Sequence, residues 1–82
     1  MDMKLFYRGF DPDLDKHLDS LALACDGKWG ATRFYEVTSG IRELQYEFTE
    51  EDDEDGFIEE VLELDAGILL EDPRLGSLSP DS

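Results

Sequence analysis

The chain has 82 residues, of which 22 are acidic and 7 are basic, and its formal net charge at pH 7 is −15. That length supports one small domain with a single core, so we do not expect multi-step catalysis on a large substrate. The negative charge disfavours direct binding to nucleic acid or to an anionic membrane. The content of 40% hydrophobic and 11% aromatic residues is that of a folded domain rather than of an acidic disordered chain.

The acidic residues are concentrated in the second half of the chain. Residues 1–42 contain 7 acids and 6 bases, a net charge of −1, whereas residues 43–82 contain 15 acids and 1 base, a net charge of −14. Like charges at this density repel one another and oppose folding. The chain therefore gains either solubility or attraction for a cationic partner from them.

The single cysteine, Cys25, excludes an intrachain disulfide and occupies an apolar helical position, so we expect a small buried side chain there. The sequence has no N-terminal apolar stretch of signal-peptide length and no stretch that approaches a membrane span. We therefore expect a cytoplasmic setting, no membrane contact and no cofactor.

The first predicted elements are a strand and a helix. Residues 3–10, MKLFYRGF, are rich in aromatics and are followed by proline, which predicts a strand. Residues 11–27 carry helix signals at both ends: Asp11 as N-cap, Pro12 at the first helical position and Gly27 as the C′ residue. One helical face collects the apolar side chains Leu14, Leu18, Leu21, Ala22 and Cys25.

A β-hairpin follows. Residues 31–38 and 41–49 are β-branched and aromatic runs, and Ser39-Gly40 between them predicts a two-residue turn. In the second run Leu44, Tyr46 and Phe48 alternate with polar residues. This alternation predicts one face toward a core and the other, with Glu43, Gln45 and Glu47, toward water.

A second helix is expected within residues 49–66. Thr49 or an acid just after it can cap the helix, and Gly67 is expected to end it. Its apolar stripe comprises Phe57, Ile58, Val61, Leu62 and Leu64. Residues 68–71, ILLE, predict a short final strand, and residues 72–82 predict a flexible C-terminal tail.

These elements predict a single α+β domain over residues 1–71. The order β-α-β-β-α-β resembles the ferredoxin-like two-layer sandwich, with two helices on one face of an antiparallel sheet. If the last short strand does not pair, the fold reduces to βαββα. The resemblance concerns element order alone and implies no function.

A calcium-binding loop is the most specific site to consider. With Gly56 at position 6 of an EF-hand loop, Glu51, Asp53 and Asp55 occupy positions 1, 3 and 5, but position 12 is Leu62 where a bidentate glutamate is required. No catalytic motif is present, and His17, the only histidine, borders an apolar helical stripe without a nucleophile partner. We therefore expect a protein that is not an enzyme and has no specific metal site.

The remaining signal is the clustering of carboxylates on ordered elements. Glu59, Glu60 and Glu63 are neighbours on a helix, and no lysine lies between them to relieve their repulsion. Carboxylates a few ångströms apart on a rigid edge can replace part of a phosphate backbone. The predicted partner-binding residues are Glu43, Glu47, Glu50, Glu51, Asp52, Asp53, Glu54, Asp55, Glu59, Glu60 and Glu63.

In size, charge and acid clustering the chain resembles the small acidic phage-type inhibitors of host defence, including anti-CRISPR and anti-restriction proteins that mimic nucleic acid. The resemblance implies a non-catalytic inhibitor that blocks the basic nucleic-acid-binding surface of a CRISPR effector or nuclease, in the host-cell cytoplasm if the gene is carried by a phage. One alternative is an immunity protein or antitoxin for a cationic nuclease. Another alternative is a calcium or small-ligand regulatory module. A further one is that the acids only confer solubility. A monomer and a dimer through the second strand are both open.

Overall fold

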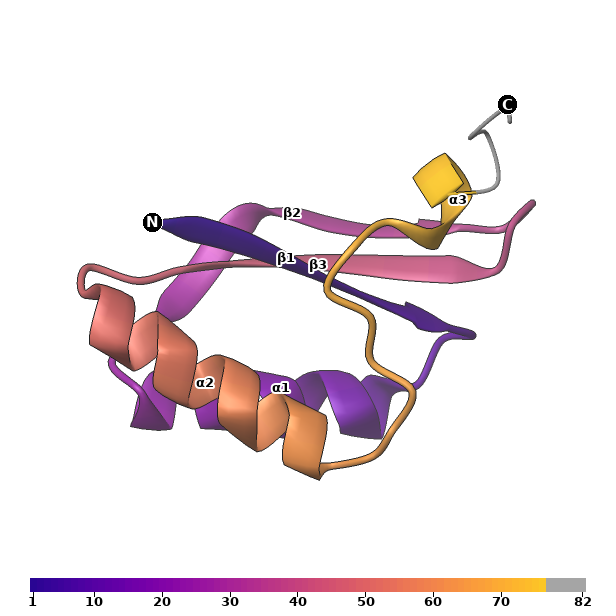
Figure 1. Cartoon of the computed structure of the whole chain (residues 1–82). Helices are drawn as coiled ribbons and strands as arrows, with labels where there is room; N and C mark the ends of the chain where they lie inside the picture. The colour runs from indigo at the N-terminus through magenta and orange to yellow at the C-terminus, as the bar shows by residue number, and fades with distance from the viewer. Residues whose placement is uncertain (77–82) are drawn as a thin grey trace.

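The computed structural model describes residues 1–76 of the chain. Its elements are β1 (Asp2–Arg8), α1 (Pro12–Ala24), β2 (Lys28–Glu36), β3 (Ile41–Glu47), α2 (Glu51–Glu63) and a short α3 (Pro73–Gly76). The three strands form one antiparallel sheet in the order β1-β3-β2, and α1 and α2 lie side by side under one face of it (Figure 1). The predicted class, a small two-layer α+β domain, is confirmed.

The segment predicted as a final strand forms a single antiparallel bridge. The N–H of Phe6 donates to the carbonyl of Leu69 over 2.9 Å, and the N–H of Leu69 donates to the carbonyl of Phe6 over 2.7 Å. Beyond Leu69 the chain leaves β1 and crosses the open face of the sheet to α3 (Figure 1). Within residues 1–76 the sheet therefore has three strands and one bridged residue in place of the expected fourth strand.

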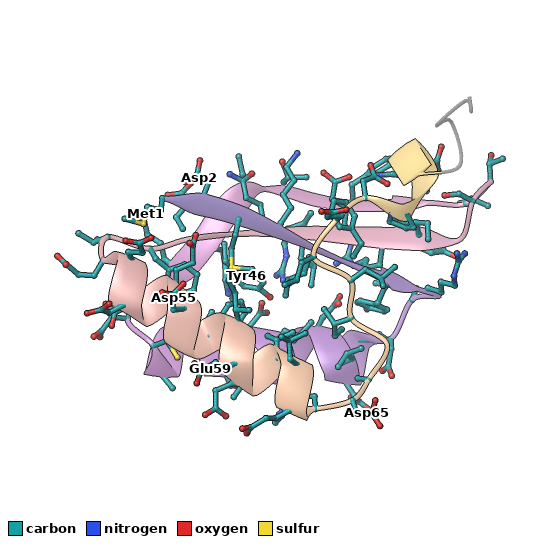
Figure 2. All side chains as sticks on the ribbon, in the orientation of Figure 1. Met1, Asp2, Tyr46, Asp55, Glu59 and Asp65 are labelled. Carbon is teal, nitrogen blue, oxygen red and sulfur yellow. The ribbon has the colours of Figure 1, made fainter. Side chains whose placement is uncertain are left out.

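The core lies between the sheet and the two long helices. Leu44, Tyr46 and Phe48 point into it as their alternation predicted, and Figure 2 shows Tyr46 between the layers. The ring centroid of Phe57 on α2 lies 5.2 Å from that of Tyr46 and 5.3 Å from that of Phe48. The other buried members of this core are Leu5, Tyr7, Leu18, Ala22 and Val61.

Two carboxylates fasten α1 to the sheet. Asp15, which is 8% exposed, accepts hydrogen bonds from the Tyr7 hydroxyl over 2.6 Å and from Arg42 over 2.8 Å. Asp19, one turn later, accepts from Arg33 over 2.7 Å and from the Tyr46 hydroxyl over 2.6 Å. Burial, together with the hydrogen bond to Asp15, raises the pKa of Tyr7 to about 12. These bonds satisfy polar groups at the edge of the core, where an unpaired group would be destabilising.

The end of α1 differs from the prediction. The residue with left-handed backbone is Asp26, at φ 62°, and the N–H of Gly27 donates to the carbonyl of Ala22 over 2.8 Å. This is a Schellman arrangement in which Gly27 follows the C′ residue. Gly27 serves packing instead, because a Cβ at this position would lie 2.4 Å from a ring atom of Phe48.

The hairpin also differs from the prediction. The turn spans residues 37–40 rather than two residues, and Gly40, at φ 71°, donates its N–H to the carbonyl of Glu36. β2 begins earlier than expected and contains a bulge, since the pairing moves from Trp29–Tyr46 to Arg33–Leu44. The carboxamide oxygen of the Gln45 side chain accepts the N–H of Thr32 within the bulge, over 3.2 Å. The alternation of residue types in the sequence does not predict this irregular strand pairing.

The second helix is shorter than expected. It ends at Glu63, with Leu64 as C-cap, because Asp65 takes a left-handed backbone at φ 52° before Gly67 is reached. Glu50 is the N-cap residue and makes no side-chain capping bond. Leu62, predicted to belong to the apolar stripe, is 56% exposed.

Two glycines give opposite predictions for the free energy of unfolding. Gly27→Ala is expected to lower it by about 1–3 kcal/mol, because the new methyl group meets the packed Phe48 ring. Gly56→Ala is expected to raise it by about 0.5–1 kcal/mol, because this glycine lies inside α2 and an added Cβ would meet nothing within 4 Å. Urea denaturation of the two variants measures both changes, and equal effects would contradict this account.

Candidate partner-binding site

The few cations of the chain neutralise acids outside α2. Within residues 1–76, none of the ion pairs includes an acid between residues 50 and 65, and residues 77–82 contain no base. Five of the seven bases take part in these ion pairs, which are Arg42–Asp15, Arg33–Asp19, Lys4–Glu43, Lys28–Glu47 and Arg74 with Glu36, Glu43 and Asp72. The charge of α2 is therefore left uncompensated by the described part of the chain.

Glu43 and Glu47, predicted as a second acidic row, are paired. The Glu43 side chain is 12% exposed and lies 3.1 Å from the Lys4 ammonium and 2.8 Å from Arg74. Glu47 lies 3.9 Å from Lys28. Both project from β3 on the side opposite Leu44 and Tyr46, which face the helices. The structure does not bring these two carboxylates together with the acids of α2.

The acids of α2 form a row along its outer surface. Glu51, Asp55, Glu59 and Glu63 recur at every fourth residue and are all exposed. Four residues advance an α-helix by about 6 Å, so the row is about 18 Å long. Figure 2 shows two of its members, Asp55 and Glu59, on α2. Phe57 and Val61 hold the opposite surface of the helix in the core.

The other acids of α2 lie on its flanks and at its start. Burial raises the pKa of the Cys25 thiol, and the charges of Glu60, Asp53 and Asp26 raise it further. Asp53 and Glu60 are seven residues, or about two turns, apart and therefore lie on one side of α2. Glu54 is half-buried, whereas the two remaining acids, Glu50 and Asp52, are exposed at the start of the helix.

The calcium-loop spacing is not realised as a loop. Residues 51–63 are continuously helical, and successive helical side chains point about 100° apart. Asp53 therefore points away from Glu51 and Asp55, and the three carboxylates do not surround one point. No group of three or more potential metal ligands is gathered within residues 1–76.

Arg74 is a structural residue that the sequence analysis did not identify. Its guanidinium donates to Glu36 and Glu43 over 2.8 Å each and to Asp72 over 2.7 Å, and it lies 6.0 Å from the Phe6 ring centre. These bonds hold the pKa of Glu36 and that of Asp72 below their ordinary values. The signal available was that Arg74 is the only base after residue 42. The rest of the predicted tail, residues 77–82, lies outside the described residues.

Acid should weaken the contact made by Arg74. A carboxylate with a lowered folded-state pKa contributes stability above its unfolded pKa and loses that contribution as pH falls through the folded value. For Glu36 and Asp72 the loss therefore falls below their ordinary values of 4.5 and 3.8. Arg74→Met should make the free energy of unfolding less dependent on pH between about 5 and 2 than the control Arg8→Met, which removes the same charge. Identical pH profiles from urea denaturation would exclude this role.

No helix within residues 1–76 is long and apolar enough to cross a membrane. Comparison with protein-family models, curated proteins and solved structures finds no match to the chain.

Proposed function

We propose that the protein is a non-catalytic inhibitor that binds the basic nucleic-acid-binding surface of a partner protein, such as a CRISPR effector or a nuclease, through α2. The observation that supports this proposal best is the outer row of Glu51, Asp55, Glu59 and Glu63. These carboxylates are exposed, regularly spaced and without a cation among the described residues. A cationic groove of complementary shape would supply the missing charge.

The charge density of α2 suits this purpose. Eight of its 13 residues are acidic. At about 1.5 Å per residue the helix is about 20 Å long, which gives one negative charge per about 2.4 Å. Duplex DNA carries one per about 1.7 Å of axis and a single strand one per about 3.4 Å. Counted over all its sides, the helix therefore carries a linear charge density between those of single-stranded and duplex nucleic acid.

The scaffold keeps these charges in place. Repulsion between acids four residues apart opposes the helix by about 0.2–0.5 kcal/mol per pair. Burial of Phe57 and Val61 against the sheet offsets this repulsion, since full burial of one large apolar side chain contributes about 1.5–3 kcal/mol. The partner then meets carboxylates that are already ordered and does not have to fix a disordered acidic segment.

An immunity protein or antitoxin for a cationic nuclease would use the same surface and is the second candidate. Such a protein differs from the inhibitor proposed above in having a single cognate toxin as its partner. We further propose that the fold is a reduced ferredoxin-like sandwich, because the Phe6–Leu69 bridge lies on the free side of β1 where a fourth strand would pair. The proposed setting is the cytoplasm, where nucleic-acid enzymes act.

Neutralising the outer row should weaken partner binding. The test variant carries Asp55→Asn, Glu59→Gln and Glu63→Gln. If each exposed charge pair contributes about 0.5 kcal/mol, the loss of three weakens binding about tenfold. The free energy of unfolding should rise by about 0.6–1.5 kcal/mol, because all three repulsive contacts between neighbours in the row disappear. Affinity capture from a bacterial lysate at low and physiological salt supplies the partner, and titration with the purified partner measures the affinity.

The control variant carries Asp13→Asn, Asp26→Asn and Asp65→Asn, which remove the same number of charges from exposed positions outside α2. The proposal predicts that this control binds within about threefold of the unmodified protein, since exposed charges outside the row act mainly through a screened field. Equal weakening by both variants would show that net charge, and not the α2 row, determines binding. Capture of no protein even at low salt would favour acids that only confer solubility.

A further inference from the structure

The outer edge of β1 is open beside the Leu69 bridge. Phe6 directs both its N–H and its carbonyl to Leu69, and the backbone groups of every second strand residue point the same way. Asp2 and Lys4 therefore direct theirs outward. Met1 belongs to the alternate set of residues, whose backbone groups point toward β3, and it exchanges hydrogen bonds with Phe48 there. Within residues 1–76 no group bonds to the outward backbone of Asp2 or Lys4.

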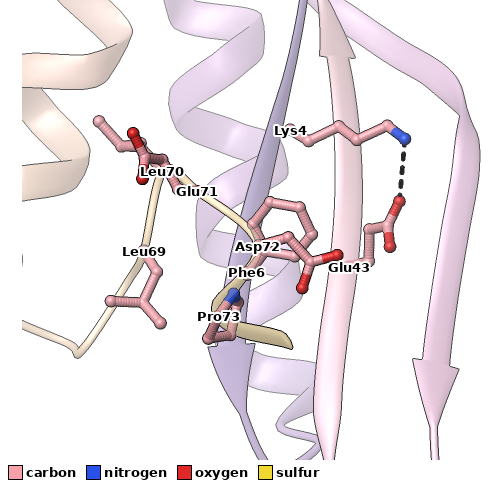
Figure 3. A pocket seen from close by; sticks show the side chains of 8 residues that line it. All are labelled: Lys4, Phe6, Glu43, Leu69, Leu70, Glu71, Asp72 and Pro73. Carbon is pink, nitrogen blue, oxygen red and sulfur yellow. Dashed lines mark ion pairs between the residues drawn. The ribbon is translucent and has the colours of Figure 1, made fainter. Parts of the chain in front are cut away.

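The two sides of this open edge differ in character. On the open face of the sheet, an open pocket of about 1030 Å³ is lined by the apolar side chains of Phe6, Leu69, Leu70 and Pro73 (Figure 3). Its charged lining residues are Lys4, Glu43, Glu71 and Asp72, of which Lys4, Glu43 and Asp72 take part in ion pairs. On the helix side, α2 lies toward β1, at the side of the sheet opposite β2 (Figures 1 and 3). Figure 2 shows Met1 and Asp2 at the same end of the molecule as Asp55. An added strand would thus have on one side a pocket in which apolar groups lie beside mostly paired charges, and on the other side the carboxylates of α2.

We propose that the open edge of β1 binds an extended segment of the partner in which basic and apolar residues alternate. This inference rests on the proposed function and specifies the contact. Backbone groups of the segment would pair with those of Asp2 and Lys4, as in strand addition to a sheet edge. Successive side chains of a strand point to opposite faces. The basic residues then meet the start of α2, and the apolar ones enter the pocket beside Phe6 and Leu70.

Within residues 1–76 the chain itself leaves this position vacant. If the antiparallel pairing continued from Leu69 opposite Phe6, Glu71 would lie opposite Lys4. The segment turns away instead, because Arg74 is bonded to Glu36 and Glu43 over the open face. Among the described residues, the backbone donors and acceptors of Asp2 and Lys4 at this edge are therefore unpaired. They lie next to the Phe6–Leu69 bridge, whose pairing a partner strand would extend.

Two synthetic peptides test the inference with the unmodified protein. In the first, lysine and valine alternate; in the second, proline replaces each valine, so that length and charge match but a ladder cannot form. We expect the lysine–valine peptide to bind at least about fivefold more tightly than the proline peptide. This factor corresponds to about one backbone hydrogen bond. At saturation the lysine–valine peptide should slow hydrogen exchange of the Lys4 amide about tenfold, measured by NMR, whereas the proline peptide should leave this amide unchanged.

A pair of variants tests the same edge from the other side. Lys4→Pro removes the outward N–H without removing a ladder bond, and edge strands tolerate proline at such positions. Lys4→Ala is the matched control, because it loses the same ion pair with Glu43 and keeps the N–H. The advantage of the lysine–valine peptide should vanish in Lys4→Pro and persist in Lys4→Ala.

Several results would overturn the inference. These are equal affinity for the two peptides, unchanged exchange at Lys4, or an advantage that survives Lys4→Pro. Protection of the Lys4 amide without peptide would show that residues 70–72 close the edge, or a second copy if the protection grows with protein concentration. Equal binding of both peptides that weakens with the α2 row variant would refute strand addition and leave the proposed function standing.

Discussion

The uneven distribution of seven cations among 22 acids decides which carboxylates of this protein are paired near the core and which stay uncompensated at the surface. Arg42 and Arg33 neutralise the acids with which α1 faces the sheet, and Lys4 and Arg74 neutralise Glu43 on the opposite face. Acids that approach the core are therefore paired, as their burial requires. The acids of α2 are left to solvent, so the remaining repulsion is concentrated on one helix whose other side is buried.

That arrangement separates stability from recognition. The core contacts of Phe57 are apolar and aromatic, and they do not depend on salt as surface charges do. Apart from Glu51, which lies in the first turn where the helix dipole favours an acid, the members of the outer row of α2 make no favourable polar contact within the described residues, and they repel one another. A surface that the fold does not need for stability is free to be shaped by binding. The open edge of β1 lies toward the same helix, so both features face one region of the molecule (Figure 3).

Much of the fold follows from local sequence signals, and the differences have identifiable causes. The inward alternation of Leu44, Tyr46 and Phe48, the N-cap at Asp11 and the apolar stripe of α1 were all predictable from periodicity and capping. Gly27 was misassigned because a glycine at a helix end fits both a left-handed backbone and close packing against a distant ring. The same limit of local signals applies to the site. Helical spacing predicts the row on α2, whereas no local pattern predicts the pairing of Glu43 with Arg74, because these residues are 31 positions apart.

The central claim is that α2 replaces nucleic acid on its partner, and competition measures this most directly. The captured partner, loaded with labelled DNA or RNA, is titrated with this protein at two salt concentrations while the bound nucleic acid is followed. The account predicts that bound nucleic acid falls in proportion to the protein added and that the protein's own affinity decreases as salt rises. A stable complex that holds partner, nucleic acid and this protein together, with an affinity indifferent to salt, would contradict it.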